Sequence, residues 1–361
     1  MNAYSMENAY ELWRKGTSGS HHVWGKVELE KNSDIKVILF PHEKYRFLNK
    51  IGNLLKISNL DQQLRMLKHL NNFDILYAPY STANTRFLLF LKWLGIFRKP
   101  IVATMHQPFL GSTSQNAIVK RVSKNSILLY DKTIFLSDKL KEKTIDQLGI
   151  PQDEARKKFT TAQWGPDTEF YKNFDTDIPL ADCKYVISAG HTDRDYETLI
   201  KAFKDVKFKL KIFCTPRSMP KNVEVPDNVE VHSEFIPYIE LMKHYTRARM
   251  ILIPLSYPEE KEGCQGMTSI QDVVALGKPT IITKNPMLNI DVEKEGFGVM
   301  VSKGSVEDWK NSLNDLLFDL DRLEKMRINA LNVYRQKYNS VLFSNKLMRV
   351  FRSVYNRHTG D

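Results

Sequence analysis

The chain has 361 residues, of which 42% are hydrophobic, and a formal net charge of +11. This length is too great for one ordinary core and predicts two domains, while no run of about 18 apolar residues is present to span a membrane. The first thirty residues lack the apolar segment of a secretory signal. The three cysteines, Cys183, Cys214 and Cys264, are too widely spaced for a disulfide framework or a zinc site, which fits a reducing cytosol.

The positive charge favours anionic partners, which include phosphates, nucleic acid and an acidic membrane surface. Lysine and arginine are scattered along the chain and form no basic tail. We therefore expect no nucleic-acid-binding arm.

Short β-rich runs alternate with helical ones in both halves of the chain, a pattern typical of parallel sheets covered by helices. The first half has predicted strands at 34–40, 73–79, 99–106 and 132–138. The second half has predicted strands at 183–190, 207–214, 229–235, 248–255 and 278–284, and predicted helices at 194–204, 238–247, 267–276 and 305–317. In such sheets ligands bind beyond the carboxyl ends of the strands.

Residues 159–183, which contain prolines, a glycine and several aspartates, mark the joint between the halves. We predict a Rossmann-like domain over 1–170, a second one over 171–340, and a final helix over 341–361 that packs back toward the first domain. The sequence of this last segment, which includes NSVLFSNKLMRVFRSVYN, has apolar residues at helical spacing.

The stretch GCQGMTSIQD contains the strongest candidate site, because a glycine-spaced loop there enters a helix near Met267. Backbone N–H groups at a helix start, with the Thr268 and Ser269 hydroxyls beside them, suit a phosphate, and Gly266 would allow close approach. Asp272 lies one turn beyond Thr268 on the same face. Its carboxylate could accept two hydrogen bonds from a ribose; the alternative is an interaction with the helix dipole.

A second loop, SAGHTDRDYETLIKAF, again joins a strand to a helix through a glycine, Gly190. Arg194 at the start of that helix could donate a planar pair of N–H groups to diphosphate oxygens. The alternative is an exposed arginine paired with Asp193, Asp195 or Glu197.

His106 ends the predicted strand KPIVATMH. A histidine at this place could donate a hydrogen bond to a sugar hydroxyl or act as an acid or base. Histidines that pack in a core or cap an element are equally common.

A fourth loop, KGTSGSHHVWG, has two glycines, Gly16 and Gly19, that suit a substrate-side loop. His21 and His22 follow at the start of a helix, where adjacent side chains diverge by about 100°. A shared metal site is therefore not expected. The simplest expectation is that one of the two packs and the other faces the ligand.

Two basic and apolar segments, 44–68 and 86–99, are candidates for other surfaces. The first could rest on an anionic membrane, where lipid-linked acceptors are found; the alternative is a covering helix with a solvated basic face. The second is expected to be mainly a buried helix before a strand.

Taken in order, these stretches resemble the retaining glycosyltransferases of the GT-B fold, in particular the family 4 group. KPIVATMH resembles the strand with the cleft histidine, and TTAQWGPDTEFY resembles the linker entry, with Trp164 in place of the usual asparagine. DKTIFLSDKLKEKTIDQLGIP, SAGHTDRDYETLIKAF and VHSEFIPYIELMKHYTRARMILIPLS match three further segments. GMTSIQDVVALGKPTIIT resembles the Leu-Leu-Glu-Ala-Met-Ala-x-Gly-Lys-Pro-Val-Ile signature.

The resemblance implies two Rossmann-like domains facing across a cleft, and it implies roles for particular residues. Asp272 matches the second glutamate of the Glu-x7-Glu motif, which binds the nucleotide ribose. The other matches are Thr268 and Ser269 with the diphosphate, Arg194 with a basic diphosphate ligand, Ile236 with a backbone contact to the nucleobase, and His106 with a contact to the donor sugar.

Three departures from the family pattern stand out. Cys264 occupies the place of the first glutamate, so either the sugar contact differs or an insertion gives that role to Glu262, two residues earlier. Asp272 is one methylene shorter than glutamate. The first strand of the family has no clear counterpart in NAYSMENAYELW, so the N-terminal sheet is expected to lack an element or the chain to begin late.

The resulting prediction is a hexosyltransferase-type enzyme that moves a sugar from a nucleotide diphosphate, with a UDP-sugar favoured, to a glycan or lipid-linked acceptor. It would act with retention, in polysaccharide or glycoconjugate biosynthesis. We expect no metal and no cofactor, because the nucleotide sugar is a co-substrate, and no nucleic-acid partner. The expected location is the cytoplasm or the inner membrane face. The alternatives are a GT-B sugar-nucleotide epimerase and a non-catalytic nucleotide-sugar or glycan binder.

Overall fold

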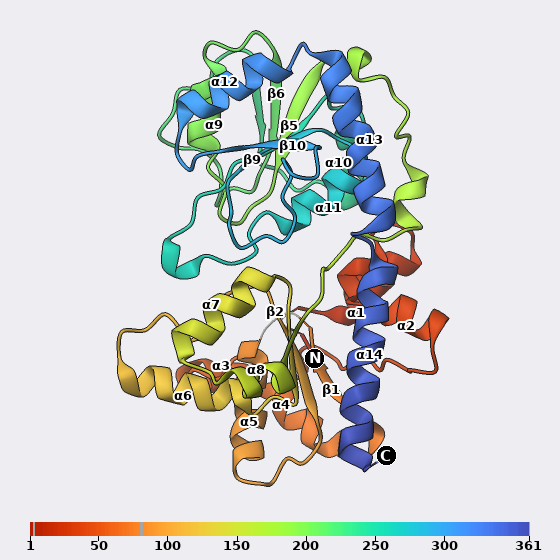
Figure 1. Cartoon of the computed structure of the whole chain (residues 1–361), viewed down its shortest axis with the longest axis vertical. Coiled ribbons are helices and arrows are strands. Elements are labelled where there is room, and N and C mark those ends of the chain that lie inside the picture. The colour runs from red at the N-terminus through yellow and green to blue at the C-terminus, as the bar shows by residue number, and fades with distance from the viewer. Residues whose placement is uncertain (3, 80–81, 361) are drawn as a thin grey trace. The chain divides into compact units, whose positions relative to one another are not determined.

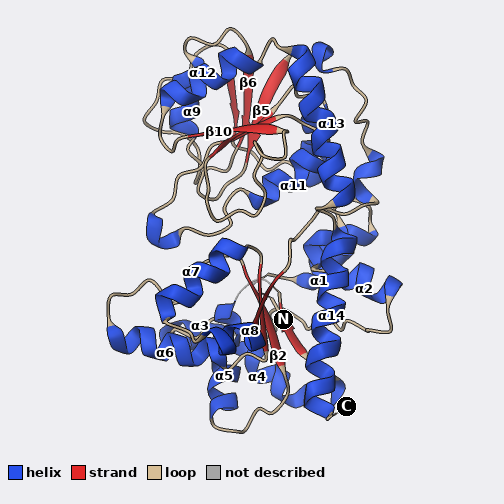
Figure 2. Cartoon of the chain, viewed as in Figure 1, coloured by secondary structure: helices blue, strands red, loops and turns tan. Residues whose placement is uncertain are grey.

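The computed structural model describes residues 1–2, 4–79 and 82–360 (Figure 1). The chain forms two compact units. The first unit comprises Met1–Trp164, Glu260–Cys264 and Ser340–Asp361, and the second comprises Gly165–Glu259 and Gln265–Asn339. Each unit has its own parallel sheet with helices around it (Figure 2). No helix in the described part of the chain is both long and apolar enough to cross a bilayer.

The second unit contains a six-stranded parallel sheet in the order β10-β9-β8-β5-β6-β7. Its strands are β5 (Tyr185–Ala189), β6 (Lys209–Phe213), β7 (Val229–His232), β8 (Ile251–Ile253), β9 (Thr280–Thr283) and β10 (Gly298–Val301). The central strands are buried, and their runs VISA, ILI and TIIT are almost wholly apolar, as expected for strands covered on both faces.

Five α-helices cover this sheet (Figure 1), and they are α9 (Tyr196–Phe203), α10 (Tyr238–Thr246), α11 (Met267–Ala275), α12 (Val306–Leu316) and α13 (Leu320–Gln336). Two apolar clusters pack these helices against the strands. The first cluster contains residues of α10, α11 and α13, and the second contains residues of α9, α12 and α13. The predicted strands and helices of this half are confirmed. β10, which was not predicted, is a half-buried edge strand.

The first unit contains a four-stranded parallel sheet in the order β1-β2-β3-β4. Its strands are β1 (Leu76–Ala78), β2 (Ile101–Met105), β3 (Lys132–Phe135) and β4 (Phe159–Thr161). Its α-helices are α1 (Met6–Arg14), α2 (Lys26–Asn32), α3 (Arg46–Leu54), α4 (Leu60–Met66), α5 (Arg86–Trp93), α6 (Ala117–Leu128), α7 (Asp138–Leu148), α8 (Gln152–Lys158) and α14 (Ser340–Thr359). The short 3-10 helices of the chain are Ser20–Val23, Leu67–Asn72, Thr82–Thr85, Phe170–Asn173, Leu180–Asp182 and Glu259–Lys261.

The strand predicted at 34–40 is wrong, and no strand occurs in the described residues before Leu76. Side chains of α2 take the place of a strand partner: the Val37 N–H donates to Glu30 Oε1 at 2.9 Å, and Lys26 Nζ donates to the Val37 carbonyl at 2.7 Å. Ile38 is 59% exposed and Ile35, Val37 and Leu39 are half-buried, so the segment is not covered on both faces as a central strand would be. Conversely, β4 comes from residues that the sequence assigned to the joint.

The C-terminal segment forms α14, as its apolar spacing predicts, and α14 packs against α2 within the first unit. Gly25, which precedes α2, makes the close approach possible. It has a φ of +90°, and a Cβ there would lie 2.7 Å from Leu347 Cδ1.

We expect Gly25→Ala to lower the free energy of unfolding of the first unit by about 2–3 kcal/mol, through the strained φ and the clash with Leu347. Thermal unfolding measures the effect. Gly16→Ala is the matched control, because Gly16 also has a positive φ, +68°, but a Cβ there would meet nothing within 4 Å. An equal loss in both variants would show that the packing of α14 contributes nothing.

Candidate functional site

The loop before α11 has the helix start that the sequence predicts. Gly266 caps the helix with a φ of 87°, and Met267 is the first helical residue. Thr268 is exposed and Ser269 is buried. The first-turn N–H groups of a helix have no partner within the helix, so this end is suited to an anion.

Arg194 reaches this helix start from the loop after β5. Its Nη2 donates to Ser269 Oγ at 2.9 Å, while Nε donates to the Ala189 carbonyl at 3.3 Å and Nη1 to the Thr192 carbonyl at 3.2 Å. Gly190 is required beside it, because a Cβ at Gly190 would lie 2.5 Å from Arg194 Nε. The structure therefore brings Gly190, Arg194 and Ser269 together.

The surface ion pair that was the alternative for Arg194 is not seen among the described residues. Asp195 instead caps α9 by accepting the Thr198 N–H at 3.2 Å. Glu197 accepts the backbone N–H groups of Lys221 and Asn222 at 3.3 and 3.2 Å. The guanidinium donates to carbonyl and hydroxyl oxygens, which are neutral, and no ion pair of Arg194 occurs among the described residues, so its charge is available to an anion.

Asp272 is 4% exposed and lies beneath two tyrosines. Its Oδ1 accepts hydrogen bonds from the Tyr171 hydroxyl at 2.6 Å and from the Tyr238 hydroxyl at 2.5 Å, and the two hydroxyl oxygens are 2.7 Å apart. Burial raises the pKa of Asp272 to about 7, although the tyrosine hydrogen bonds lower it. Burial and the adjacent carboxylate raise the pKa of both tyrosines, which therefore stay protonated.

The helix-dipole alternative for Asp272 is wrong, because Asp272 is the sixth residue of α11 and no acid lies in the first turn. The two tyrosines were missed by the sequence analysis. Tyr171 comes from the 3-10 helix Phe170–Asn173 and Tyr238 is the first residue of α10. The chain separates them from Asp272 by 101 and 34 residues, so no local spacing could reveal the group.

Ile236 lies in the loop between β7 and α10, where it is partly buried against the first apolar cluster of the second unit. Its neighbour Phe235 is 92% exposed. The backbone at Ile236 is thus in a loop that starts at the carboxyl end of β7, where the sequence placed it.

His106, which follows β2, contacts the segment Glu260–Cys264 within the first unit. Its carbonyl accepts the Cys264 N–H at 2.7 Å. A Cβ at Gly263 would lie 2.6 Å from the same oxygen. The His106 side chain is half-buried. This loop therefore belongs to the first unit, whereas α11, which follows it, belongs to the second.

The two candidates for the first motif acid have different chemistry. Burial raises the pKa of the Cys264 thiol to about 12, so it is neutral and cannot replace a carboxylate. Glu262 Oε2 accepts a hydrogen bond from Lys143 Nζ of α7 at 2.8 Å, and its side chain remains 20% exposed.

The loop with the paired histidines is mainly a packing element. Gly16 is exposed with a positive φ, and Gly19 caps the 3-10 helix Ser20–Val23. His21 is 1% exposed, and burial followed by the charge of His22 lowers its pKa. His22 is half-buried, so one histidine packs, as expected.

Trp164, which stands where the resembled glycosyltransferases have asparagine, packs against the same histidine loop. Its ring stacks on Trp24 with centroids 4.7 Å apart, and its Nε1 donates to the His21 carbonyl at 3.1 Å. The Trp164 side chain, which replaces that asparagine, therefore packs in the core of the first unit. No group of three or more His, Cys, Asp or Glu side chains in the described residues is placed to hold a metal.

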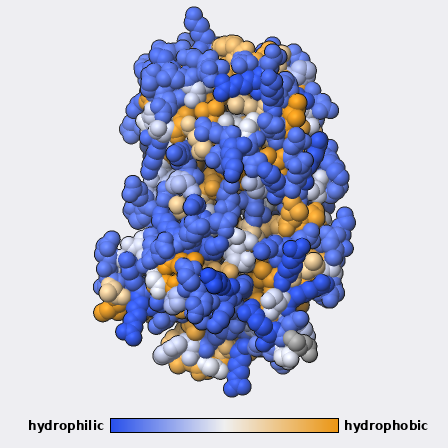
Figure 3. Space-filling view, viewed as in Figure 1, coloured by the Kyte–Doolittle hydropathy of each residue, from blue (hydrophilic) through white to orange (hydrophobic). Residues whose placement is uncertain are grey.

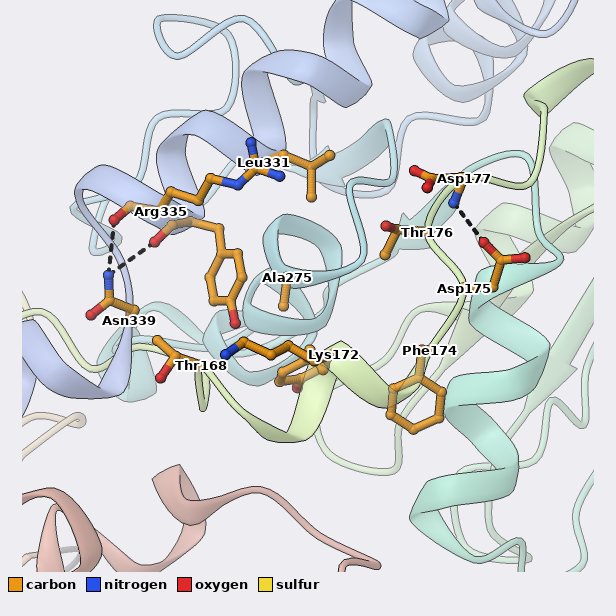
Figure 4. Close-up of a pocket in the computed structure, with 12 residues that line it drawn as sticks. Thr168, Lys172, Phe174, Asp175, Thr176, Asp177, Ala275, Leu331, Arg335 and Asn339 are labelled. Carbon is orange, nitrogen blue, oxygen red and sulfur yellow. Dashed lines mark hydrogen bonds between the residues drawn. The ribbon is translucent and has the colours of Figure 1, made fainter. Parts of the chain in front are cut away.

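A cavity of about 560 Å³ lies in the second unit (Figure 4). It is lined by residues 168–177 of the joint, by the end of α11, and by α13 and the residues after it. The lining residues are Thr168, Tyr171, Lys172, Phe174, Asp175, Thr176, Asp177, Ala275, Leu331, Tyr334, Arg335 and Asn339. Only Tyr171 is shared with the Asp272 group, and none of the sequence-predicted site residues lines the cavity. It is therefore separate from the Arg194 and Ser269 site.

No protein-family model matches the chain, and no curated protein matches its sequence. Solved structures do match it. Anabaena Alr3699/HepE in complex with UDP-glucose gives a TM-score of 0.60 at 16% identity, covering 91% of this chain and 88% of that chain. Sucrose-phosphate synthase from Thermosynechococcus elongatus gives 0.60 at 15% identity, covering 90% and 82%. The S. aureus MnaA–UDP co-structure gives 0.56 at 12% identity, covering 94% of both chains.

At these identities the similarity defines the fold. The mixed α/β chain with two parallel-sheet units has the GT-B fold, and this prediction from the sequence is confirmed.

Proposed function

We propose that the protein is a glycosyltransferase that uses a nucleotide diphosphate sugar, with a UDP-sugar favoured. The observation that carries this proposal is the Arg194 guanidinium, which lies against Gly190 and donates to Ser269 at the start of α11. A planar cation beside unsatisfied helix N–H groups suits a diphosphate. Structures of similar fold contain UDP or UDP-glucose, which supports this ligand class.

In this proposal Arg194 and the α11 start stabilise the negative charge that develops on the leaving diphosphate. Fixed donors of this kind act without reorganisation during the reaction. Thr268 and Ser269 add hydroxyl contacts, and the backbone near Ile236 meets the nucleobase. The transfer would proceed with retention and would need no metal.

We place the ribose at the Asp272 group. The carboxylate is already bonded to Tyr171 and Tyr238, so the group as a whole would receive the ribose hydroxyls. Tyr238 is the more exposed of the two tyrosines, which makes its hydroxyl the candidate for direct contact, with Asp272 behind it.

His106 and Glu262 of the first unit are the candidates for contacts to the donor sugar. Glu262 is favoured over Cys264 because it is an acid with part of its side chain exposed, whereas the Cys264 thiol is buried and neutral. The Glu262 carboxylate pairs with Lys143 at 2.8 Å. Of the loop residues proposed for the acceptor side, the exposed Gly16 and the half-buried His22 remain candidates, whereas Gly19 and His21 are buried.

The acceptor would be a glycan or a lipid-linked sugar in polysaccharide or glycoconjugate biosynthesis, and the reaction would take place in the cytoplasm or at the inner membrane face. The test is release of free nucleoside diphosphate from a panel of nucleotide sugars, with and without acceptor extracts. Acceptor-dependent release supports the transferase. Tight nucleotide binding without turnover would favour the non-catalytic binder, and interconversion of nucleotide sugars without release would favour the epimerase.

A further inference from the structure

Helix α3 of the first unit presents its apolar face outward. Phe47, Ile51, Leu54 and Leu55 follow helical spacing, so they share one side, and they are 60%, 47%, 85% and 59% exposed. The buried residue of α3 is Gly52. A Cβ there would lie 2.5 Å from the Ile57 carbonyl oxygen, so the helix packs through its glycine side and leaves its apolar side uncovered.

Helix α5 repeats this arrangement at its C-terminal end. Phe90 and Trp93 are 51% and 67% exposed, and Leu94 and Ile96, which follow the helix, are 48% and 63% exposed. The opposite side of α5 is buried in the core. The expectation that residues 86–99 form mainly a buried helix is therefore correct for one face only. Figure 1 places α3 and α5 in the lower part of the view, together with α6 and α7, and apolar side chains are exposed in that part of Figure 3.

A hydrogen bond joins the two helices at these faces. Arg86 Nη1 at the start of α5 donates to the Lys56 carbonyl, just after α3, at 2.8 Å. Arg86 precedes Phe90 by four residues and Trp93 by seven, so the three share one side of α5. The exposed residues form one surface, called here the α3–α5 surface, which comprises Phe47, Ile51, Leu54, Leu55, Phe90, Trp93, Leu94 and Ile96.

The charges around the α3–α5 surface are predominantly positive. Residues 44–60 and 86–99 contain eight Lys or Arg residues and no Asp or Glu, and the basic residues are Lys44, Arg46, Lys50, Lys56, Arg86, Lys92, Arg98 and Lys99. Two of them are paired with acids from outside these segments, Arg46 with Glu43 and Lys92 with Asp131. The remaining charge is not balanced locally, and Lys50 and Lys56 are exposed beside the apolar stripe.

We propose that the α3–α5 surface binds an anionic lipid bilayer. Exposed aliphatic and aromatic side chains ringed by Lys and Arg match the boundary between acyl chains and anionic headgroups, and long basic side chains can keep their charges at the headgroups while their stems contact apolar groups. A second copy of the chain is the other possible occupant, but it would place two uncompensated positive surfaces face to face.

This inference deepens the proposed location of the transferase by naming the surface that contacts the membrane, and its test needs no turnover. The full chain is mixed with vesicles of phosphatidylcholine, with or without phosphatidylglycerol, and the bound fraction is measured by sedimentation at low and high salt. We expect binding only with phosphatidylglycerol, weakened by salt. Equal binding to both vesicles, or to neither, would overturn the proposal.

Two double variants locate the contact. Leu54→Ser with Trp93→Ser is expected to lower the partition coefficient about tenfold or more, because each removes exposed apolar area. Lys50→Glu with Lys56→Glu is expected to lower it about as much, because two positive charges near the headgroups become negative. Both pairs are exposed, so the fold should be retained, and an unchanged thermal unfolding profile checks this.

The matched controls lie in the second unit. Phe318 and Ile328 are 64% and 57% exposed, and replacing both by serine removes similar apolar area, with binding expected to stay within about twofold. Equal losses in the control and the test variants would overturn the assignment. Self-association that the Leu54 and Trp93 changes abolish, in a protein that binds no vesicles, would assign the surface to a second copy. Nucleotide affinity is measured in the same variants, so that a failure of the bilayer-binding proposal can be distinguished from a failure of the proposed transferase function.

Discussion

Replacing Arg194 by alanine should lower kcat/KM for nucleotide-sugar turnover about 100- to 1000-fold, the usual cost of removing one charged donor from a developing anion. The guanidinium is the only part of this site that combines a full charge with a planar pair of donors. Its position is set by contacts to Ala189, Thr192 and Ser269. Release of nucleoside diphosphate under conditions of low substrate gives the measurement.

Three further variants distinguish the charge of Arg194, the position of its planar guanidinium, and the effect of removing any nearby cation. Arg194→Lys keeps the charge but loses the planar fork, so an intermediate loss is expected. Gly190→Ala should displace the guanidinium, because its Cβ would lie 2.5 Å from Arg194 Nε, and should approach the loss of Arg194→Ala. Lys201→Ala removes an exposed cation of α9 and should change little. Full activity in Arg194→Ala would refute the diphosphate assignment.

Replacing Asp272 by asparagine should weaken nucleotide affinity about 10- to 100-fold, because a charged hydrogen-bond partner becomes neutral. It should also remove a pH dependence of stability. The pKa of Asp272 is raised from 3.8 to about 7 by burial, so the folded state holds a proton that the unfolded state releases between these values. The stability contributed by this group is present below about pH 4 and is lost as the pH rises to about 7, by on the order of 4 kcal/mol.

Thermal unfolding of the wild type and of Asp272→Asn across this pH range measures the effect, because other titrating groups cancel in the difference. A difference independent of pH would contradict the assigned titration. Nucleotide binding completes the test with Tyr171→Phe and Tyr238→Phe. Both remove a hydrogen bond to Asp272, but only Tyr238→Phe should reduce the preference for a nucleotide with its ribose hydroxyls over the 2′-deoxy form. An equal preference for the ribonucleotide in Tyr171→Phe and Tyr238→Phe would show that the ribose does not contact Tyr238.

The second unit could be predicted closely from the sequence. The first could be predicted in part: strands β1, β2 and β3 lie where they were expected, whereas the strand at 34–40 is absent and β4 was not predicted. Buried parallel strands require continuous apolar runs, and the runs around Ile187, Leu252 and Ile281 are unambiguous. Residues 34–40 have an equally strand-like sequence, yet Glu30 and Lys26 satisfy the backbone of Val37 from α2. An apolar run joins a sheet only if a neighbouring strand, and not a side chain, bonds its backbone. That choice depends on tertiary contacts.

The same division applies to the candidate site. The glycine and hydroxyl pattern before Met267 and the glycine before Arg194 could be recognised because a helix start and a strand end are local features. The contact between Arg194 and Ser269 spans 75 residues. It exists only because β5 and β8 are neighbours in the sheet, which places the loops after them at one edge.

By itself, the sequence determined the fold class, the position of α11 and the residues near its start, because these follow from local periodicity, glycine placement and apolar content. Only the tertiary structure decided that Asp272 is buried beneath Tyr171 and Tyr238, that Cys264 is a neutral buried thiol, and that α3 and α5 expose one apolar surface. Each of these depends on the exclusion of water by segments distant in the chain, and burial of that kind sets both the charge of a side chain and the surface it presents.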